Sequence, residues 1–293
     1  MSHVFEYAVA RAIFAVLGSA PPALCEPVGG ALGRLAYRVG WRRRVVESQI
    51  SQAFPEKDEK WVRRTAIASF EHVGRESAAV APIVRRGLDE VRRRLVVFEG
   101  REEMEAAVAR GRGVVVASAH FGNWEFAGST LAASGWPVDA VMQRLGNRHL
   151  NRYVEHMRGK LGMGLIDRVG AWDRLTESLA AGRVVAFVAD QDARHRGVFV
   201  PFFGRPASTH KAPALLALRT GAPFFVGGVH RIGRQQYHAW LVRLDPVDGL
   251  GTREQIIDLT RRWLAEVELR VRLFPEQYFW HHRRWKTQPP GTA

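Results

Sequence analysis

The feature that most constrains the fold is a regular alternation of short apolar runs with amphipathic segments after residue 87. Apolar runs such as residues 114–119 and 184–189 have the length of buried strands, and the segments between the runs have the apolar spacing of helices. Strands that alternate with helices form a mostly parallel or mixed sheet flanked by helices. The sequence therefore predicts an α/β fold. The expected strands are residues 95–98, 114–119, 138–142, 184–189, 223–229 and 237–244, and the expected helices are residues 101–110, 124–134, 149–161, 172–181, 212–220 and 253–273.

Residues 1–84 lack this alternation and are predicted to be helical. Asp58 is placed to cap a long helix whose apolar residues recur at helical spacing. We expect residues 1–84 to form a helical, membrane-associating segment packed on an α/β body of residues 85–287. Because the helical part is too small and too apolar to stand free, both parts are expected to form one structural domain.

The first apolar segment, residues 4–17, is too short to cross a bilayer. It carries Glu6 and Arg11, and Pro21 and Pro22 end it. As a helix it would reach only about two-thirds of the roughly 30 Å hydrocarbon core. It also lacks the leading positive charge of a signal peptide. Two interpretations stay open: a core helix, or an amphipathic helix that lies in the membrane interface.

The chain is strongly basic, with 43 Lys and Arg against 29 Asp and Glu and a formal net charge of +14. Such a surface attracts an acidic partner, a phosphate-bearing substrate or an anionic bilayer. The single Cys25 makes an internal disulfide impossible, which fits a reducing cytoplasm and excludes a Cys-rich metal site. We expect no metal and no cofactor.

His120 directly follows the predicted strand 114–119, at the end where open α/β sheets place their chemistry. Glu125 lies five positions later, so on one continuous helix the two side chains would point about 140° apart. A strand-to-helix elbow, with Asn123 before the first helical turn, would let them meet. Glu125 would then orient the imidazole, and His120 would act as a general base. Taken alone, the pair is equally compatible with a structural role.

A second predicted strand, residues 184–189, ends in Asp190, Gln191 and Asp192 at what should be the same edge of the sheet. Asp190 could orient an arginine or a substrate amide there, or it could simply cap a turn. Arg144, Asn147, Arg148 and Arg158 lie between these two strands along the chain, and arginine is suited to bidentate recognition of phosphate.

The roles of two further segments cannot be chosen from the sequence alone. Residues 197–204 are expected to form a loop that either lines an acyl-chain groove or belongs to the core. Residues 275–286 mix aromatic with basic side chains, as membrane interfaces and proteins that bind single-stranded nucleic acid do. The chain has no acyl-enzyme serine elbow, zinc-protease helix or P-loop, which leaves direct base catalysis.

These motifs, in this order, resemble the late acyltransferases of lipid A biosynthesis, within the wider lysophospholipid acyltransferase group. The histidine, four residues and an acid that mark this family are matched by His120 and Glu125. The resemblance extends over about residues 4–287. Further matches are Phe121-Gly122-Asn123-Trp124, Arg144 with Asn147, Arg158, Asp190-Gln191-Asp192, Phe202-Phe203-Gly204 with Thr209, and the closing Pro275-Glu276-Gln277-Tyr278 with Trp280, Arg283, Arg284 and Lys286.

The resemblance implies an enzyme at the cytoplasmic face of the bacterial inner membrane. It would move a fatty acyl group from acyl carrier protein to a hydroxyl of a lipid A precursor, without a cofactor. Relatives that acylate phosphatidylinositol mannosides or other glycolipids from acyl-CoA have overlapping motifs, so that acceptor and donor are the alternative. Because residues 4–17 are short and charged, we expect peripheral or monotopic attachment to an anionic membrane surface. The resemblance implies catalytic roles for His120 and Glu125, and substrate-binding or site-shaping roles for Asn123, Arg144, Asn147, Arg158, Asp190, Gln191 and Thr209.

The mechanism expected from these residues is direct transfer. His120 would take the proton of the acceptor hydroxyl while Glu125 holds the ring, and the oxygen would attack the thioester without a covalent acyl-enzyme. A rival interpretation, a nucleic-acid-binding protein, explains the positive charge but leaves His120 and Glu125 unused and lacks any known nucleic-acid-binding motif. We therefore expect no nucleic acid partner. A membrane-bound interaction protein with an inactive acyltransferase body would not retain both residues.

Overall fold

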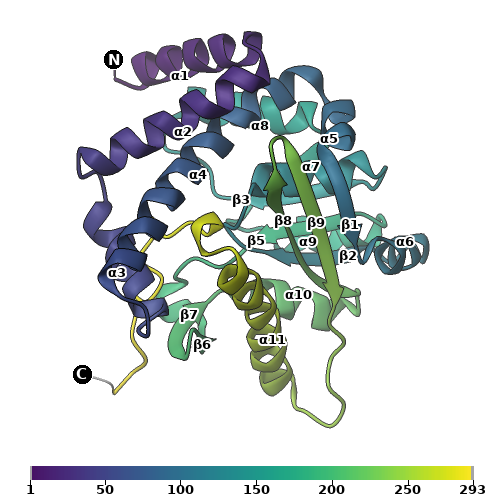
Figure 1. The fold of residues 1–293 in the computed structure, drawn as a ribbon. Helices are drawn as coiled ribbons and strands as arrows, with labels where there is room; N and C mark the ends of the chain where they lie inside the picture. Colours follow the sequence, from purple (N-terminus) through teal and green to yellow (C-terminus); the bar gives the residue numbers. More distant parts are fainter. Residues whose placement is uncertain (1, 292–293) are drawn as a thin grey trace.

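The alternating part of the chain folds around a seven-stranded sheet with the strand order β1-β9-β8-β2-β5-β3-β4 (Figure 1). This computed structural model describes residues 2–291; Met1, part of the predicted segment 1–84, lies outside them. Strands β8, β2, β5, β3 and β4 are parallel to one another, and β9 and β1 run the opposite way. The predicted mixed sheet is confirmed. The strands are β1 (Leu95–Glu99), β2 (Val114–Ser118), β3 (Val138–Met142), β4 (Met163–Asp167), β5 (Val184–Val188), β8 (Phe224–Gly233) and β9 (Gln236–Arg243).

Helices cover both faces of the sheet because the side chains of a central strand are buried on both sides. In β2, Val115 and Ala117 face one apolar core and Val114 and Val116 face a second core. Such a strand reads as one continuous apolar run, as in parallel sheets. The first core includes α9 (Trp172–Ala180), α10 (Ala212–Thr220) and α11 (Thr252–Leu273), and the second includes α6 (Arg101–Ala109) and α7 (Trp124–Ala133), with α8 (Arg148–Lys160) beside β4.

The N-terminal part is helical, as predicted, and lies beside the sheet in Figure 1. Asp58 caps its longest helix by accepting a 2.7 Å hydrogen bond from the backbone N–H of Trp61. Two of the helices touch backbone to backbone: a Cβ on Gly33 would lie 2.0 Å from the carbonyl oxygen of Phe70. Only glycine permits that approach. The helices are α1 (Ser2–Ser19), α2 (Pro22–Arg38), α3 (Arg43–Ala53), α4 (Glu59–Arg86) and α5 (Leu88–Arg94).

Residues 197–204 do not form the expected loop. They belong to a hairpin of β6 (Val198–Phe202) and β7 (Arg205–Thr209), whose turn has positive φ at Phe203 and Gly204. Left-handed residues at both turn positions match the right-handed twist of a hairpin. The core interpretation of this segment is correct, because Val200 and Phe202 are buried in the first core. Strand β4 and helix α5 were also not predicted.

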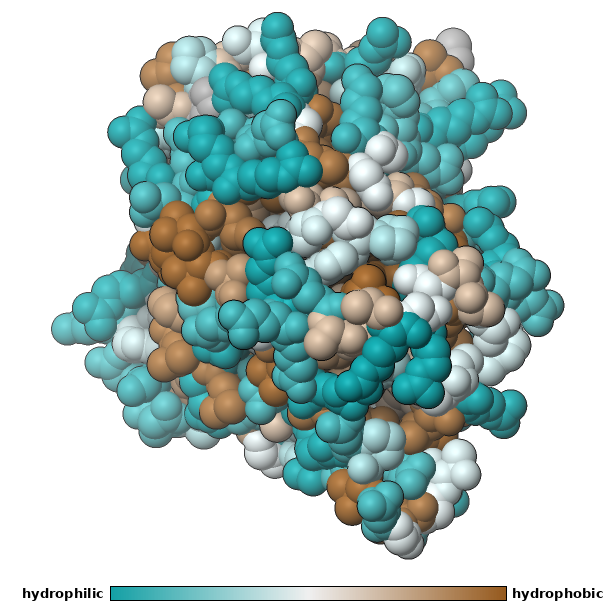
Figure 2. Space-filling model, turned by 90° about the vertical axis from the view of Figure 1, so that its right-hand side faces the viewer, coloured by the Kyte–Doolittle hydropathy of each residue, from teal (hydrophilic) through white to brown (hydrophobic). Residues whose placement is uncertain are grey.

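The surface carries most of the charge. The side of the molecule shown in Figure 2 is dominated by hydrophilic side chains, with apolar patches between them. Two arginines are exceptions, since Arg94 and Arg284 are fully buried. Among residues 2–291, no helix combines the length and the apolar character that a membrane crossing needs.

Candidate active site

His120 lies where β2 ends, and its imidazole is held by a carboxylate from the neighbouring strand. Ser118 of β2 pairs with Val188 of β5, so the residues that follow both strands lie side by side. The Nδ1 atom of His120 lies 2.7 Å from Oδ1 of Asp190, and the backbone N–H of His120 donates to the same oxygen at 3.0 Å.

Asp190 is fully buried, yet it stays ionised. Burial raises the pKa of this carboxyl, but the side chain and backbone N–H of His120 outweigh burial and hold the pKa well below its usual range. An ionised carboxylate only accepts hydrogen bonds. Nδ1 of His120 therefore carries a proton and donates it to Asp190, and in the neutral form of the ring Nε2 keeps the lone pair that a base needs.

Glu125 does not hold the ring, so the predicted contact between His120 and Glu125 is wrong. Both carboxylate oxygens of Glu125 accept hydrogen bonds from Arg158 of α8, at 2.9 and 2.5 Å. Although burial lowers the pKa of Arg158, its bond to Glu125 outweighs burial and raises the pKa. The planar guanidinium of Arg158 matches the carboxylate with two parallel bonds, which explains the preference of Glu125 for this partner.

The predicted strand-to-helix elbow is confirmed. Asn123 caps α7, because its side-chain oxygen accepts a 2.9 Å hydrogen bond from the backbone N–H of Phe126. Gly122 has a φ of 59°, and a Cβ there would lie 1.8 Å from the carbonyl oxygen of Val229. Its N–H donates to the carbonyl of Gln277 at 2.9 Å. The turn after His120 is thus packed between β8 and the C-terminal segment.

The C-terminal segment forms one wall of the site. The rings of Phe279 and His282 lie 6.0 and 6.3 Å from the ring of His120, and Trp124 lies 5.2 Å from it. Burial lowers the pKa of His282 to about 3, so this second histidine is neutral. Tyr278, Trp280 and Trp285 are buried, so these rings are not available to stack on bases.

Two apolar pockets meet beside this site, and both are lined by Trp124, Glu125 and Arg158. One, of about 80 Å³, runs between α7 and the sheet. The other, of about 270 Å³, lies between α7, α4, α8 and α1. The surfaces of both pockets are mainly apolar, which suits hydrocarbon chains. The apolar side chains come from both aliphatic and aromatic residues. They include Val116, Leu131, Ala140 and Met163 in the first pocket and Phe14, Val80, Val154 and Met157 in the second.

Not all of the predicted site residues gather here. Gln191 lies at the imidazole, with its Nε2 atom 3.4 Å from Nε2 of His120. Thr209 is buried and accepts a hydrogen bond from Arg284 at 2.6 Å. Arg144 pairs with Asp167 at 3.0 Å, and Asn147 caps α8 and donates to the carbonyl of His3 in α1. Arg144 and Asn147 thus bind neighbouring parts of the fold, whereas the contacts with the imidazole of His120 come from other residues.

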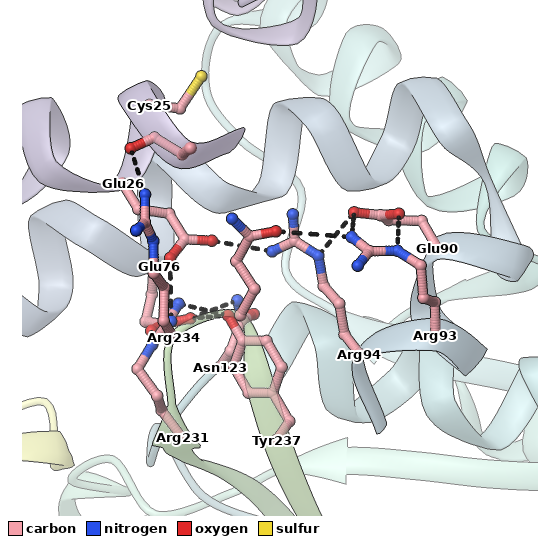
Figure 3. Close-up of polar contacts among 12 residues, drawn as sticks. Cys25, Glu26, Glu76, Glu90, Arg93, Arg94, Asn123, Arg231, Arg234 and Tyr237 are labelled. Carbon is pink, nitrogen blue, oxygen red and sulfur yellow. Dashed lines mark hydrogen bonds and ion pairs between the residues drawn. The ribbon is translucent and has the colours of Figure 1, made fainter. Parts of the chain in front are cut away.

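Sequence reasoning missed Glu76 of α4, which supports the elbow through Asn123 (Figure 3). The buried carboxylate of Glu76 accepts hydrogen bonds from Asn123 at 2.8 Å, Arg231 at 2.5 Å and Tyr237 at 2.6 Å. Burial raises the pKa of Glu76, but Arg231 and these hydrogen bonds outweigh burial and hold the pKa below normal. His72, one turn earlier, contacts the carbonyl of Gly122 at 3.2 Å.

Glu76 is one member of a chain of buried charges, seen in Figure 3. Arg231 also binds Glu26 of α2 at 3.0 Å, and Arg94 joins Glu26 to Glu90 at 3.0 and 2.8 Å. Arg94 and Glu90 are one helical turn apart, but the partners of Glu26 and Glu76 are widely separated along the chain, so no local pattern identifies them. The only sequence signal is an acid at position 76 directly before the largely apolar run from Ser77 to Val84.

Comparison with known proteins gives two groups of relatives. The phosphatidylinositol mannoside acyltransferase of Mycolicibacterium smegmatis is 30% identical over 70% of this chain and 68% of its own length. That of Mycobacterium tuberculosis is 36% identical over 43% of this chain, and the match spans only 41% of that relative. The lipid A biosynthesis lauroyltransferase of Escherichia coli is 28% identical over 90% of this chain and 86% of its own length.

The family profile described as bacterial lipid A biosynthesis acyltransferase matches residues 2–287. That range contains the strand-end histidine, the acid in the first turn of α7 and the carboxylate that holds the imidazole. The chain belongs to the bacterial lipid A biosynthesis acyltransferase family.

Proposed function

We propose that this protein is an acyltransferase that moves a fatty acyl group from a thioester to a hydroxyl of a membrane glycolipid. The observation that carries the proposal is the 2.7 Å pair of His120 and Asp190 beside two apolar pockets. The pair supplies a base, and the pockets supply apolar surface for hydrocarbon chains. Family membership points to the same chemistry.

In the proposed mechanism, Nε2 of His120 takes the proton of the acceptor hydroxyl, and the hydroxyl oxygen attacks the thioester carbonyl. The tetrahedral intermediate expels the thiolate, which takes the proton back from Nε2. Asp190 stabilises the imidazolium between these steps, as the acid of a catalytic triad does. Because a thiol is far more acidic than an alcohol, its departure needs little acid assistance. No acyl-enzyme forms in this proposal, because the acceptor oxygen itself attacks the thioester. Backbone N–H groups at the start of α7 are the candidates for stabilising the oxyanion.

Glu125 acts in this proposal through Arg158 rather than through the imidazole. The two residues line both pockets at the point where the pockets meet. At that point the ion pair of Glu125 and Arg158 can orient polar groups of the substrates, while the hydrocarbon chains of the substrates lie against the apolar walls of the pockets. Removing Glu125 would leave the half-buried Arg158 without its partner, so its loss should affect substrate binding as well as turnover.

For the substrates we propose acyl carrier protein as the donor and a lipid A precursor as the acceptor. The similarity to the lipid A lauroyltransferase of Escherichia coli over most of both chains supports this choice. The alternative is transfer from acyl-CoA to a phosphatidylinositol mannoside or a similar glycolipid, and the relative from Mycolicibacterium smegmatis supports it.

We further propose that α1 and α2 attach the enzyme to the cytoplasmic face of the inner membrane without crossing it. Four exposed apolar residues recur every three or four positions along α2, and a fifth follows directly after its end: Leu24, Val28, Leu32, Leu35 and Val39. A stripe of this kind, with arginines nearby, suits the interface of an anionic bilayer. Phe5, Ile13 and Val16 of α1 are exposed as well.

The function is tested with purified protein, both donors and both acceptors, by mass spectrometry of the lipid products. We expect acyl transfer from at least one donor, and a loss of about 10² to 10⁴ in turnover for His120→Ala. Transfer at the parental rate by that variant would refute the role of His120. The α2 stripe is tested by sedimentation with anionic vesicles, in which Val28→Asp with Leu32→Asp should abolish binding.

A further inference from the structure

A basic pocket lies outside the site described above, between α3 and the C-terminal segment. Its volume is about 330 Å³. Arg44, Ser48 and Gln52 of α3 line one side, and Arg283 and Lys286 line the other. Val45, Gln49 and Trp285 complete its walls. We call it the α3 pocket.

The positive charge of the α3 pocket is uncompensated. Its walls contain no acid, and Arg44, Arg283 and Lys286 make no ion pair or side-chain hydrogen bond with any other residue of the described range 2–291. Several other exposed arginines differ, because they pair with an acid one helical turn away. Examples are Arg101 with Glu105, Arg261 with Asp258 and Arg272 with Glu268. Three converging cations in a hollow create an attraction for anions that a solvated helix face lacks.

Trp285 forms part of the wall of the α3 pocket. Trp285 is only 5% exposed, and its indole N–H has no acceptor among residues 2–291. The guanidinium of Arg205 lies 5.6 Å from the centre of the Trp285 ring. The guanidinium of Arg205 therefore adds positive charge next to this wall of the α3 pocket.

The position of the α3 pocket ties it to the reacting centre. Its C-terminal residues lie between two contacts with the active site: the ring of His282, 6.3 Å from that of His120, and the hydroxyl of Thr287, 2.9 Å from the carboxylate of Asp192. The backbone N–H of Arg284 donates to the side chain of Gln49 at 2.7 Å, which fixes this segment on α3.

We propose that the α3 pocket binds the phosphate of the phosphopantetheine arm of the acyl donor, the group that acyl-CoA and acyl carrier protein share. This inference rests on the proposed function. The acyl chain needs the apolar pockets at Trp124, and the thioester must lie at His120. The phosphopantetheine arm must therefore extend from His120 across a polar part of the surface. The α3 pocket offers such a surface, with two arginines and a lysine whose donors suit a phosphate.

The test compares three donors that carry the same acyl chain: acyl-CoA, acyl carrier protein and acyl-pantetheine, which lacks the phosphate. In Arg44→Ala with Lys286→Ala, the KM for both phosphate-bearing donors should rise about tenfold, because charge-assisted hydrogen bonds are lost. The KM for acyl-pantetheine, the KM for the acceptor and kcat should not change. Arg253→Ala, an exposed and unpaired arginine at the start of α11, is the matched control and should leave all values unchanged.

Each other outcome decides the question. A rise for acyl-CoA alone overturns the proposal, because it assigns the pocket to phosphates that only coenzyme A carries. A rise for acyl carrier protein alone, or for the acceptor alone, overturns the proposal. So does a parental enzyme that uses acyl-pantetheine with the KM of acyl-CoA.

Direct binding separates this proposal from the proposed function. Titration with coenzyme A, followed by tryptophan fluorescence, should give an affinity that falls about tenfold in the double variant. Intact binding of coenzyme A without acyl transfer from any donor would refute the function and leave the pocket in place. Acyl transfer together with the same affinity for coenzyme A in the parental protein and the double variant would refute the role of the α3 pocket and leave the proposed function in place.

Discussion

Asp190→Asn is the most direct test of how the imidazole is activated. The substitution keeps the shape of the side chain and removes the charge that lies 2.7 Å from Nδ1 of His120. Opposite unit charges about 4 Å apart attract by about 4 kcal/mol at an effective dielectric constant of about 20. Because the imidazolium forms only during the reaction, that energy is lost from the transition state, and kcat should fall about a thousandfold. The amide introduced by this substitution can also donate to Nδ1, which would place the ring proton on Nε2 and remove the base.

The assay is initial-rate acyl transfer by Asp190→Asn and by Glu125→Gln, with thermal unfolding as a check on the fold. We expect the large loss in kcat for Asp190→Asn, with the KM of the acceptor nearly unchanged. Glu125→Gln should lose less in kcat and raise KM, because it disturbs Arg158. Asp258→Asn, on the outer surface of α11, is the charge-matched control. A thousandfold loss in Glu125→Gln together with near-parental turnover in Asp190→Asn would refute the assignment.

Three further predictions concern stability. Glu76→Ala should lower the free energy of unfolding by about 3–5 kcal/mol in urea titrations, because it leaves Arg231 partly unpaired in the interior, and a loss below about 1 kcal/mol would contradict this account. Burial lowers the pKa of His230 and of His281 to about 4 each, so the unfolded chain binds their protons first as the pH falls below about 6.5. The free energy of unfolding should therefore be highest above that pH and lower by about 2 kcal/mol per histidine at pH 5. If His281→Phe left the dependence of this free energy on pH unchanged, His281 would make no contribution to it. Gly33→Ala should cost about 1–3 kcal/mol or more, because the new methyl group meets a carbonyl oxygen of α4, and an unchanged melting temperature would show that the two helices can separate.

The sequence predicts most of the fold because periodicity is a local property. Helices and strands of the α/β body appear within a few residues of their predicted ends, and Asp58 and Asn123 cap the helices as expected. Strand β4 was missed because its five residues include Gly164 and lie at an edge of the sheet. The hairpin of β6 and β7 was missed because it forms a separate two-stranded sheet outside the alternation of strands and helices.

The contacts within the site are less predictable from local sequence patterns than the helices and strands are. His120 and Asp190 were both placed at strand ends on one edge, but the choice between two acids as the partner of the imidazole depends on register. Pairing of Ser118 with Val188 carries Asp190 to the ring, whereas Glu125 turns toward Arg158. That register depends on how strands far apart in the sequence pair, which local patterns do not specify. The buried charges at Glu76 were invisible for the same reason, because its partner Arg231 lies 155 residues away.

The buried charges also decide how this enzyme can be dissected. The amphipathic helices at the start of the chain invite truncation to obtain a fragment that is easier to purify. Such a fragment would lose Glu76 and His72, so Asn123 would keep its hydrogen bond to α7 but lose its support from α4. A chain trimmed at residue 84 should therefore fail as a catalyst even in detergent. Improving solubility is better done by replacing the exposed apolar side chains of α2 one at a time.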